Sequence, residues 1–176
     1  LTRNQTKEDF MKQYGYMKQK GFTLMELIVT TAIAVTIGGI ASSGIESTQY
    51  WLEPKRLFSV IQETRTLSIT NNSYAVLCPS ENELVCQSDW ELPLILFIDS
   101  NNNKQRDIEE EIINRFTPYP QLSRSITYPR KQIRFNGLGQ INGYTGTLTY
   151  CSELNSKGIV LSRVGRIRYS EEDKCS

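Results

Sequence analysis

Three arginines stand close together near the end of the chain: Arg163, Arg166 and Arg168. A guanidinium group is planar and matches the oxygens of a phosphate, so clustered arginines are suited to binding a polyanion. Gly165 lies between the first two and suits a tight turn, because glycine adopts backbone conformations that other residues avoid. The spacing predicts a hairpin in which Arg166 and Arg168 project from one face of its second strand.

Charge is distributed unevenly along a chain whose net charge is only +1. Residues 81–111 carry nine acidic and two basic side chains, a net charge of −7. Residues 124–168 carry eight basic and one acidic side chain, a net charge of +7. Besides the cluster around Gly165, the basic residues that could support polyanion binding are Arg124, Arg130, Lys131 and Arg134. The two stretches either face each other as complementary surfaces, or the basic one contacts a polyanion such as nucleic acid.

The sequence contains no histidine, which excludes Ser-His-Asp and Cys-His catalysis and any histidine-ligated metal site. Residues from Asp99 to Glu110 match most ligand positions of an EF-hand calcium loop, but Lys104 stands where that loop needs glycine and Arg106 adds a second cation. We interpret this run as a polar hairpin turn. We therefore expect no catalytic residue, no cofactor and no metal.

The first 45 residues have the layout of a targeting or membrane segment. Residues 1–21 have a net charge of +3, and residues 22–45 contain 14 apolar side chains and a single charge, Glu26. A helix over residues 22–45 would be about 36 Å long, enough to cross a hydrocarbon core of roughly 30 Å. The basic flank predicts that residues 46–176 lie on the far side of the membrane from the cytoplasm.

Glu26 distinguishes between interpretations of this segment. A cleaved secretory signal, with Gly39-Ile40-Ala41 as the cleavage site, or a plain membrane anchor would explain the apolar run. Neither needs a carboxylate four residues into it, where an unpaired charge is costly. We expect Glu26 to be functional and to pair with a cation on a neighbouring chain.

The stretch Lys20-Gly21-Phe22-Thr23-Leu24-Met25-Glu26-Leu27 resembles the class III signal of type IV prepilins and type II secretion pseudopilins. The resemblance implies cleavage by a prepilin peptidase between Gly21 and Phe22, and N-methylation of Phe22. It also implies that Glu26 neutralises the N-terminal amine of an adjacent subunit during assembly. Residues 1–21 are then a leader, for which Met17 or Met11 could be the true start, and residues 22–45 a transmembrane and assembly helix.

Residues 46–176 are expected to form an α+β head. Apolar residues at three-to-four-residue spacing predict a helix over 46–70, with a kink near Pro54 and a stop at Asn71-Asn72. Short β-type runs separated by turn residues follow. The expected strands are 73–78, 92–99, 111–117, 131–136, 146–151, 158–162 and 166–169. The pattern predicts a long helix packed on antiparallel hairpins.

Four cysteines allow two disulfides in three connectivities: Cys78, Cys86, Cys151 and Cys175. Beyond the inner membrane the compartment is oxidising, so pairing is expected. We favour the sequential pairs 78–86 and 151–175, because each joins neighbouring hairpin segments. A metal site of four cysteines is disfavoured by the lack of close Cys-x-x-Cys spacing.

The order of motifs in the head is similar to the GspH/FimT family of minor pilins and pseudopilins. The motifs are Trp90, Phe97 to Asn103, Ile133-Arg134-Phe135, Gly146-Thr147-Leu148, Cys151 and Gly165-Arg166-Ile167-Arg168. The resemblance implies a pilin-like fold, with a globular head on the C-terminal part of a long helix. In FimT-type members the Gly-Arg-x-Arg motif is associated with binding DNA during natural transformation. Gly165, Arg166 and Arg168 match it directly, and Arg163 lies beside it.

We therefore expect a minor pilin-like subunit of a type IV pilus, not an enzyme, that captures DNA. The expected partners are other pilin subunits, a prepilin peptidase, the inner membrane and DNA. The expected location is the bacterial inner membrane, with one membrane pass and a periplasmic head. After assembly, the expected location is the pilus tip, which can reach the cell surface. The alternatives without DNA binding are a structural minor pilin that primes assembly and a type II secretion pseudopilin. A membrane-anchored periplasmic domain that never polymerises is a further alternative.

Overall fold

The computed structural model describes residues 21–42, 45–170 and 175, with side chains described outside residues 36–47. The chain divides into two units, one ending at Ser43 and the other beginning at Gly44. The first unit contains α2 (Leu24–Ser42), a largely apolar helix. Thr23 caps α2, because its hydroxyl accepts a hydrogen bond from the Glu26 N–H at 3.3 Å.

The apolar side chains of the first unit are exposed within that unit, among them Phe22, Leu24, Met25, Leu27 and Ile28. No helix in the described part of the chain combines the length and the apolar character needed to cross a membrane. The membrane passage expected for residues 22–45 stays a prediction. The expected leader falls outside the described residues, apart from Gly21.

The second unit, which we call the head, begins with α3 (Ile45–Thr70). Sequence periodicity predicted this helix from residue 46, and its predicted stop at Asn71-Asn72 is confirmed. Asn72 has a φ of 46°, in the left-handed region that asparagine tolerates better than most residues. The helix therefore ends through a local signal that the sequence carries.

Pro54 lies inside α3, where it removes one backbone donor. The carbonyl of Tyr50, four residues earlier, would accept that missing hydrogen bond in a regular helix. The side-chain amide of Asn155, from the turn between β6 and β7, donates to this carbonyl at 3.0 Å instead. The turn is thereby fastened to the helix at the point where the helix ladder is incomplete.

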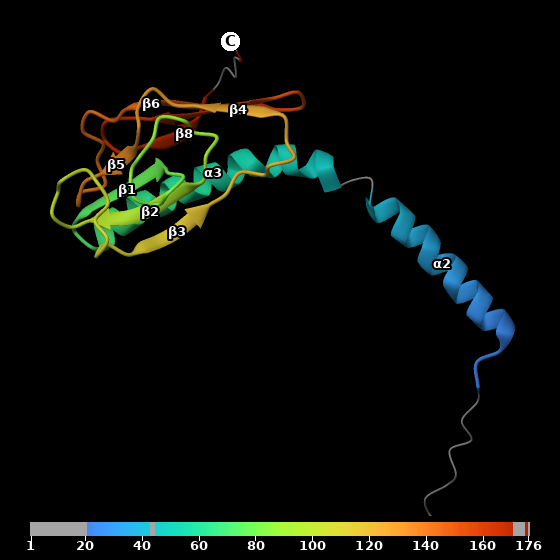
Figure 1. Ribbon diagram of the computed structural model, residues 1–176. Coiled ribbons are helices and arrows are strands. Elements are labelled where there is room, and N and C mark those ends of the chain that lie inside the picture. The colour runs from blue at the N-terminus through green and yellow to red at the C-terminus, as the bar shows by residue number, and fades with distance from the viewer. Residues whose placement is uncertain (1–20, 43–44, 171–174, 176) are drawn as a thin grey trace, which may run out of the picture. The chain divides into compact units, whose positions relative to one another are not determined.

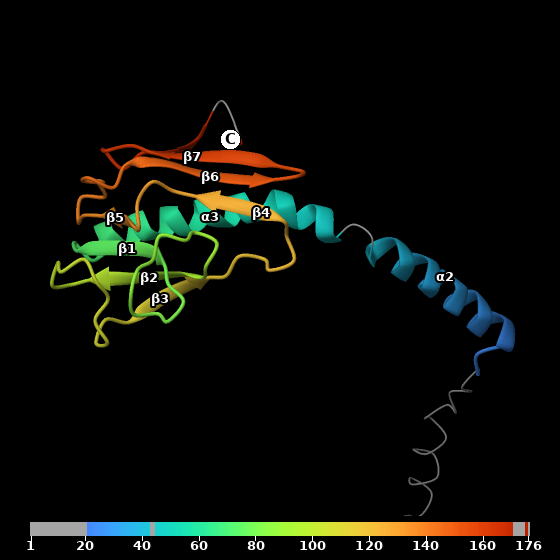
Figure 2. The ribbon, with the colours of Figure 1, turned by 45° about the horizontal axis from the view of Figure 1, so that its top comes forward.

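The described head contains two antiparallel sheets of four strands each. The first has the order β3-β2-β1-β5, built from β1 (Tyr74–Pro79), β2 (Leu94–Asp99), β3 (Ile112–Phe116) and β5 (Ile133–Phe135). The second has the order β4-β6-β7-β8, built from β4 (Arg124–Thr127), β6 (Gly146–Ser152), β7 (Ser156–Leu161) and β8 (Ile167–Tyr169). Figure 1 shows α3 running along the strands, and in Figure 2 the second sheet lies above it and the first below.

The predicted α+β fold, with a long helix on antiparallel hairpins, is confirmed, and the structure adds one strand that the sequence did not predict. This strand, β4, has four residues, of which only Ile126 is buried. A segment this short carries too little alternation to be recognised. Its pairing with β6, in which Ile126 lies opposite Tyr150, extends the second sheet.

One apolar core joins α3 to both sheets. It contains Leu57 and Ile61 of α3, Leu96 of the first sheet, and Leu148 and Ile159 of the second, all fully buried. Because one core contacts all three layers, the helix and the two sheets stabilise one another.

A smaller apolar cluster lies on the other face of the first sheet and contains Val76, Cys78, Ile95 and Phe97. Cys86, from the loop after β1, packs against it. Both faces of β1 and β2 are therefore covered, which explains why these strands are continuous apolar runs instead of alternating ones.

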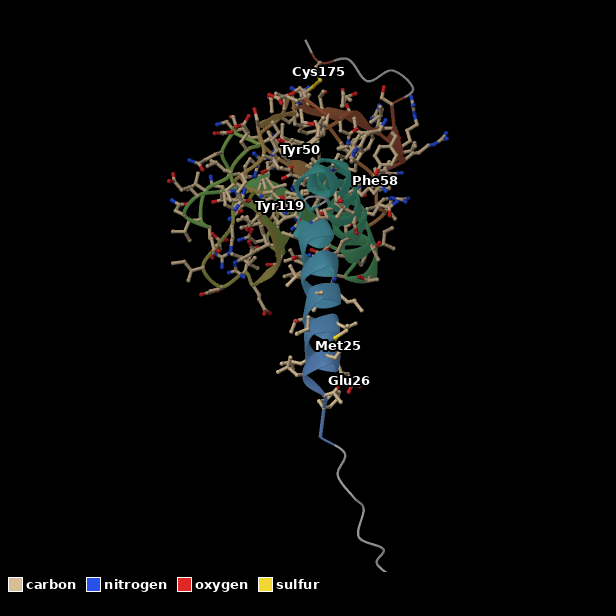
Figure 3. All side chains as sticks on the ribbon, turned by 90° about the vertical axis from the view of Figure 1, so that its right-hand side faces the viewer. Met25, Glu26, Tyr50, Phe58, Tyr119 and Cys175 are labelled. Carbon is tan, nitrogen blue, oxygen red and sulfur yellow. A yellow bond between two sulfur atoms is a disulfide. The ribbon has the colours of Figure 1, made fainter. Side chains whose placement is uncertain are left out.

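The two disulfides that the sequence favours are present, Cys78–Cys86 and Cys151–Cys175. The first closes the loop that packs on the smaller cluster. The second ties residue 175 to β6 and is visible beside the label of Cys175 in Figure 3. Closing the longer loop contributes about 3 kcal/mol to stability in the chain-entropy description.

Candidate nucleic-acid interface

The arginine cluster lies on a tight hairpin between β7 and β8, as the sequence predicted. The Gly165 N–H donates to the Ser162 carbonyl at 2.9 Å. The Arg166 N–H donates to the Ser162 hydroxyl at 3.0 Å. Because β8 is an edge strand, the hairpin lies at the margin of the second sheet.

The three arginines of this hairpin are exposed. Ile167, which separates Arg166 from Arg168, is half-buried and packs against the core. This alternation places Arg166 and Arg168 on one face of β8. Within the described residues, no carboxylate forms an ion pair with Arg163, Arg166 or Arg168. The hairpin therefore carries three exposed cations that have no acidic partner in the described part of the head.

Gly165 is required by packing as well as by the turn. Its φ is +81°, a conformation that side chains with a Cβ rarely adopt. A Cβ at this position would lie 1.7 Å from the Gly139 carbonyl oxygen, in the loop after β5. The same loop is bound to the hairpin by the Ile141 N–H, which donates to the Arg163 carbonyl at 2.9 Å. The tip of the hairpin is therefore docked on that loop.

The base of the hairpin rests on α3. Tyr169 stacks on Phe58 of the helix, with ring centroids 4.6 Å apart and an angle of 19° between the planes (Figure 3 labels Phe58). Partial burial raises the pKa of the Tyr169 phenol above its ordinary value, so the stacked ring stays neutral at physiological pH. Docked at its tip and its base, the hairpin presents its arginines from a defined position.

Arg65 of α3 contacts the loop on which the tip of the hairpin is docked. Its Nε donates to the Gly139 carbonyl at 3.1 Å, so it lies beneath the docked tip. Together with Arg166 it lines a groove of about 430 Å³ between α3 and the hairpin. Sequence analysis did not single out Arg65, because it belongs to no motif and only the fold brings it next to Arg166.

Arg124 and Arg134 hold different positions from the hairpin arginines. Arg124 forms an ion pair with Glu53 at 3.2 Å, and Arg134 forms one with Asp99 at 2.7 Å. The side chains of the two arginines are only 8% and 6% exposed. Their guanidinium groups are committed to pairs inside the head. Arg134–Asp99 is also the ion pair that joins the acidic and basic stretches within the described residues.

Arg130 and Lys131 are exposed but line a different groove, of about 440 Å³, together with Tyr144 and Val85. The backbone carbonyl of Arg130 accepts a hydrogen bond from the Trp90 indole at 2.8 Å, which fixes this segment to the core. The basic stretch of the sequence is thus divided in space between the hairpin, the interior and this second groove.

The polar run from Asp99 to Glu110 forms a loop in which backbone groups satisfy the carboxylates. Asp99 accepts from the N–H groups of Asn103 and Lys104 at 3.1 and 3.0 Å, and Glu110 accepts from that of Ser100 at 2.8 Å. No three histidine, cysteine or acidic residues in the described ranges are grouped so as to hold a metal ion. The loop has the hydrogen bonds of a polar turn.

The residues of the expected processing signal lie in the first unit. Gly21 and Phe22 precede α2 and belong to no helix, and Phe22 is 79% exposed. Glu26 lies in the first turn of α2, where Figure 3 labels it. Its side chain forms no ion pair with a described residue.

Comparison with known proteins gives one family and one fold. A family model described as type II transport protein GspH matches residues 55–165. Among solved structures, the type IV minor pilin FimU of Pseudomonas aeruginosa strain PAO1 is similar in two crystal forms. The P21 form has a TM-score of 0.56 at 11% identity and covers 71% of this chain and 90% of that chain. The P65 form has a TM-score of 0.50 at 11% identity, and the match covers 66% of this chain and 88% of that chain. No curated protein sequence matches the chain.

Proposed function

The chain belongs to the GspH family, and from this membership and the exposed arginine hairpin we propose that it is a minor pilin-like subunit that binds extracellular DNA for natural transformation. Members of this family are structural components of the cell envelope that interact with other pilin-like subunits, and they are not enzymes. The absence of catalytic activity expected from the sequence is therefore confirmed by the family.

The observation that carries the DNA proposal is the exposure of three guanidinium groups on one docked edge hairpin. Arginines that project from a fixed scaffold bind phosphate oxygens at little conformational cost. Contacts of this kind go to the DNA backbone, so binding should be independent of sequence and should weaken as salt is raised. The resemblance of Gly165-Arg166-Ile167-Arg168 to the FimT motif supports the same proposal.

A titration of the oxidised full-length chain, kept in mild detergent, with a 30-base-pair duplex at several salt concentrations tests this proposal. Changing Arg163, Arg166 and Arg168 together to glutamine should abolish measurable binding at physiological salt. At low salt, the slope of log K against log salt should fall by about three, because each lost phosphate contact lowers it by about one.

The matched control is the double change Arg130→Gln and Lys131→Gln, which removes two exposed cations from the other groove. This double variant should have a slope of log K against log salt that differs by no more than about one from the slope of the unchanged chain. Binding that survives the triple change and disappears in the double variant would move the DNA site to Arg130 and Lys131.

A type II secretion pseudopilin without DNA binding is the alternative that the description of the family model favours. A structural minor pilin that primes assembly makes the same prediction in the titration. If the intact chain, with both disulfides formed, does not bind DNA at low salt, these alternatives replace the DNA proposal.

We further propose that the chain is made as a prepilin and is processed between Gly21 and Phe22 by a prepilin peptidase, with N-methylation of Phe22. Residues 22–45 then insert in the inner membrane and the head lies in the periplasm, reaching the pilus tip after assembly. The position of Gly21 and Phe22 ahead of α2, outside any helix, supports access by a peptidase.

Changing Glu26 to glutamine should lower the share of the protein found in sheared filaments by about tenfold. The proposed reason is that a carboxylate in apolar surroundings needs a cation, and here it would neutralise the N-terminal amine of an adjacent subunit. Glutamine keeps the size of the side chain and removes only its charge. Thr31→Ala, an exposed change farther along α2, serves as the control, and equal retention of the Glu26→Gln and Thr31→Ala proteins would contradict the assembly role.

A further inference from the structure

The groove between α3 and the arginine hairpin has only cations among its charged lining residues. Its lining consists of Gln62, Arg65, Thr66 and Ile69 of α3 with Val164, Arg166 and Ile167 of the hairpin. Two of these side chains are cationic and none is acidic. Like charges that share a recess repel each other unless an anion lies between them.

Arg65 differs from the buried arginines Arg124 and Arg134 in having no partner carboxylate within the described ranges. Arg124 is paired with Glu53 and Arg134 with Asp99, whereas Arg65 binds a neutral carbonyl, that of Gly139, through its Nε. Among the described residues, its two Nη atoms, which carry four of the five guanidinium hydrogens, make no hydrogen bond. Arg65 is half-buried, so these donors have lost part of their contact with water.

We propose that this groove is a phosphate subsite for DNA, in which Arg65 of α3 and Arg166 of the hairpin bind the same stretch of phosphodiester backbone. The inference rests on the proposed DNA-binding function of the hairpin and extends that function to the helix. Gln62 and Thr66 add neutral polar groups to the helix side of the groove. The volume of about 430 Å³ lies in the range of ordinary small-ligand pockets.

The fold explains why the two arginines converge. Gly165 lets the hairpin approach the Gly139 carbonyl closely, and Arg65 donates to the same carbonyl. The carbonyl therefore fixes the helix arginine relative to the hairpin tip. In this arrangement DNA would contact α3 and the hairpin, which are about a hundred residues apart in the sequence. The Gly139 carbonyl contacts both elements and so links them.

The test uses the oxidised full-length chain in mild detergent and the same 30-base-pair duplex at several salt concentrations. Arg65→Gln should raise the Kd by about tenfold and reduce the salt slope by about one, the effect of one lost phosphate contact. Gln62→Glu should also raise the Kd, because it places a carboxylate in the groove without touching the Arg65–Gly139 hydrogen bond. Ser59→Glu, exposed on α3 but lining another groove, should change the Kd less than twofold once long-range charge is screened.

The outcomes separate this inference from the function on which it rests. If the triple hairpin change abolishes binding while Arg65→Gln and Gln62→Glu leave the Kd and slope unchanged, the subsite is refuted and the hairpin function stands. If Arg65→Gln weakens binding but Gln62→Glu behaves like Ser59→Glu, Arg65 acts only by positioning Gly139 and the phosphate contact is refuted. If the intact chain does not bind DNA at low salt, both proposals fail together.

Discussion

Replacing Gly165 by alanine should release the arginine hairpin from the head and destabilise the protein by about 3 kcal/mol, or about 10 °C in Tm. Two effects add. A residue with a Cβ pays about 1–2 kcal/mol to adopt a left-handed conformation such as the φ of +81° at this position. The Cβ would also lie 1.7 Å from the Gly139 carbonyl oxygen, which is backbone and cannot rotate away. Thermal unfolding followed by circular dichroism measures the loss.

Gly143 offers a matched control for this change. Its φ is +79°, nearly that of Gly165, yet a Cβ built on it would meet no atom within 4 Å. Gly143→Ala should therefore cost only the conformational term, about 1–2 kcal/mol. The difference between the two variants measures the docking of the hairpin on Gly139. Equal Tm values would show that the close approach at Gly165 contributes nothing.

Replacing Arg124 by methionine should destabilise the head by about 3–5 kcal/mol, because it leaves a buried carboxylate without its cation. Glu53 is fully buried, and its Oε1 accepts from the Arg124 Nε at 3.2 Å and from the Tyr119 N–H at 2.8 Å. With the guanidinium removed, the Tyr119 N–H and the buried Tyr150 phenol remain near the charge, and neither is a cation. Equilibrium unfolding in urea measures the change in the free energy of unfolding. The slope of this free energy against urea concentration should be the same for the variant and the unchanged chain.

Two further variants test the origin of that loss. Adding Glu53→Gln to Arg124→Met should recover most of the lost stability, since the amide oxygen can still accept from the Tyr119 N–H and no charge is left in the interior. The exposed pair Arg115–Glu83, whose side chains are 55% and 44% exposed, provides the comparison. Arg115→Met should cost no more than about 1 kcal/mol despite a shorter ion-pair distance of 2.6 Å. A loss equal to that of Arg124→Met would contradict the role given to burial.

The parts of the fold that sequence analysis predicted depend on local signals. The apolar spacing of Leu57 and Ile61 identifies α3, and Asn72 marks its end. Gly165 marks the turn of the hairpin between β7 and β8. The division into two sheets was not predictable, because it depends on which distant strands pair. β5, for example, pairs with β1 and places Phe135 opposite Ala75.

The candidate site shows the same distinction. The hairpin of Arg163, Arg166 and Arg168 was predicted because its turn and alternation are contained in six residues. The burial of Arg134 was not predicted. Nothing in Ile133-Arg134-Phe135 indicates that the fold brings Asp99 within ion-pair distance of it. The contact of Arg65 with the hairpin region was not predictable for the same reason. The apolar periodicity of a helix does not indicate which distant loop packs beside a given residue of that helix.

The gap that Pro54 leaves in α3 has a mechanical consequence. A helix under tension yields first where its hydrogen-bond ladder is incomplete, and here that place lies between Tyr50 and Pro54. Asn155, from the turn between β6 and β7, donates to the Tyr50 carbonyl, and Arg124 of β4 is paired with the Glu53 carboxylate. Two side chains that belong to the second sheet or its connecting turn are therefore bound to the helix within one of its turns. A force that pulls on the N-terminal end of α3 is therefore transmitted in part to the second sheet before the helix can unwind. The segment from Tyr50 to Pro54, where the helix lacks a backbone hydrogen bond, is thus also the segment through which the force passes to the rest of the head.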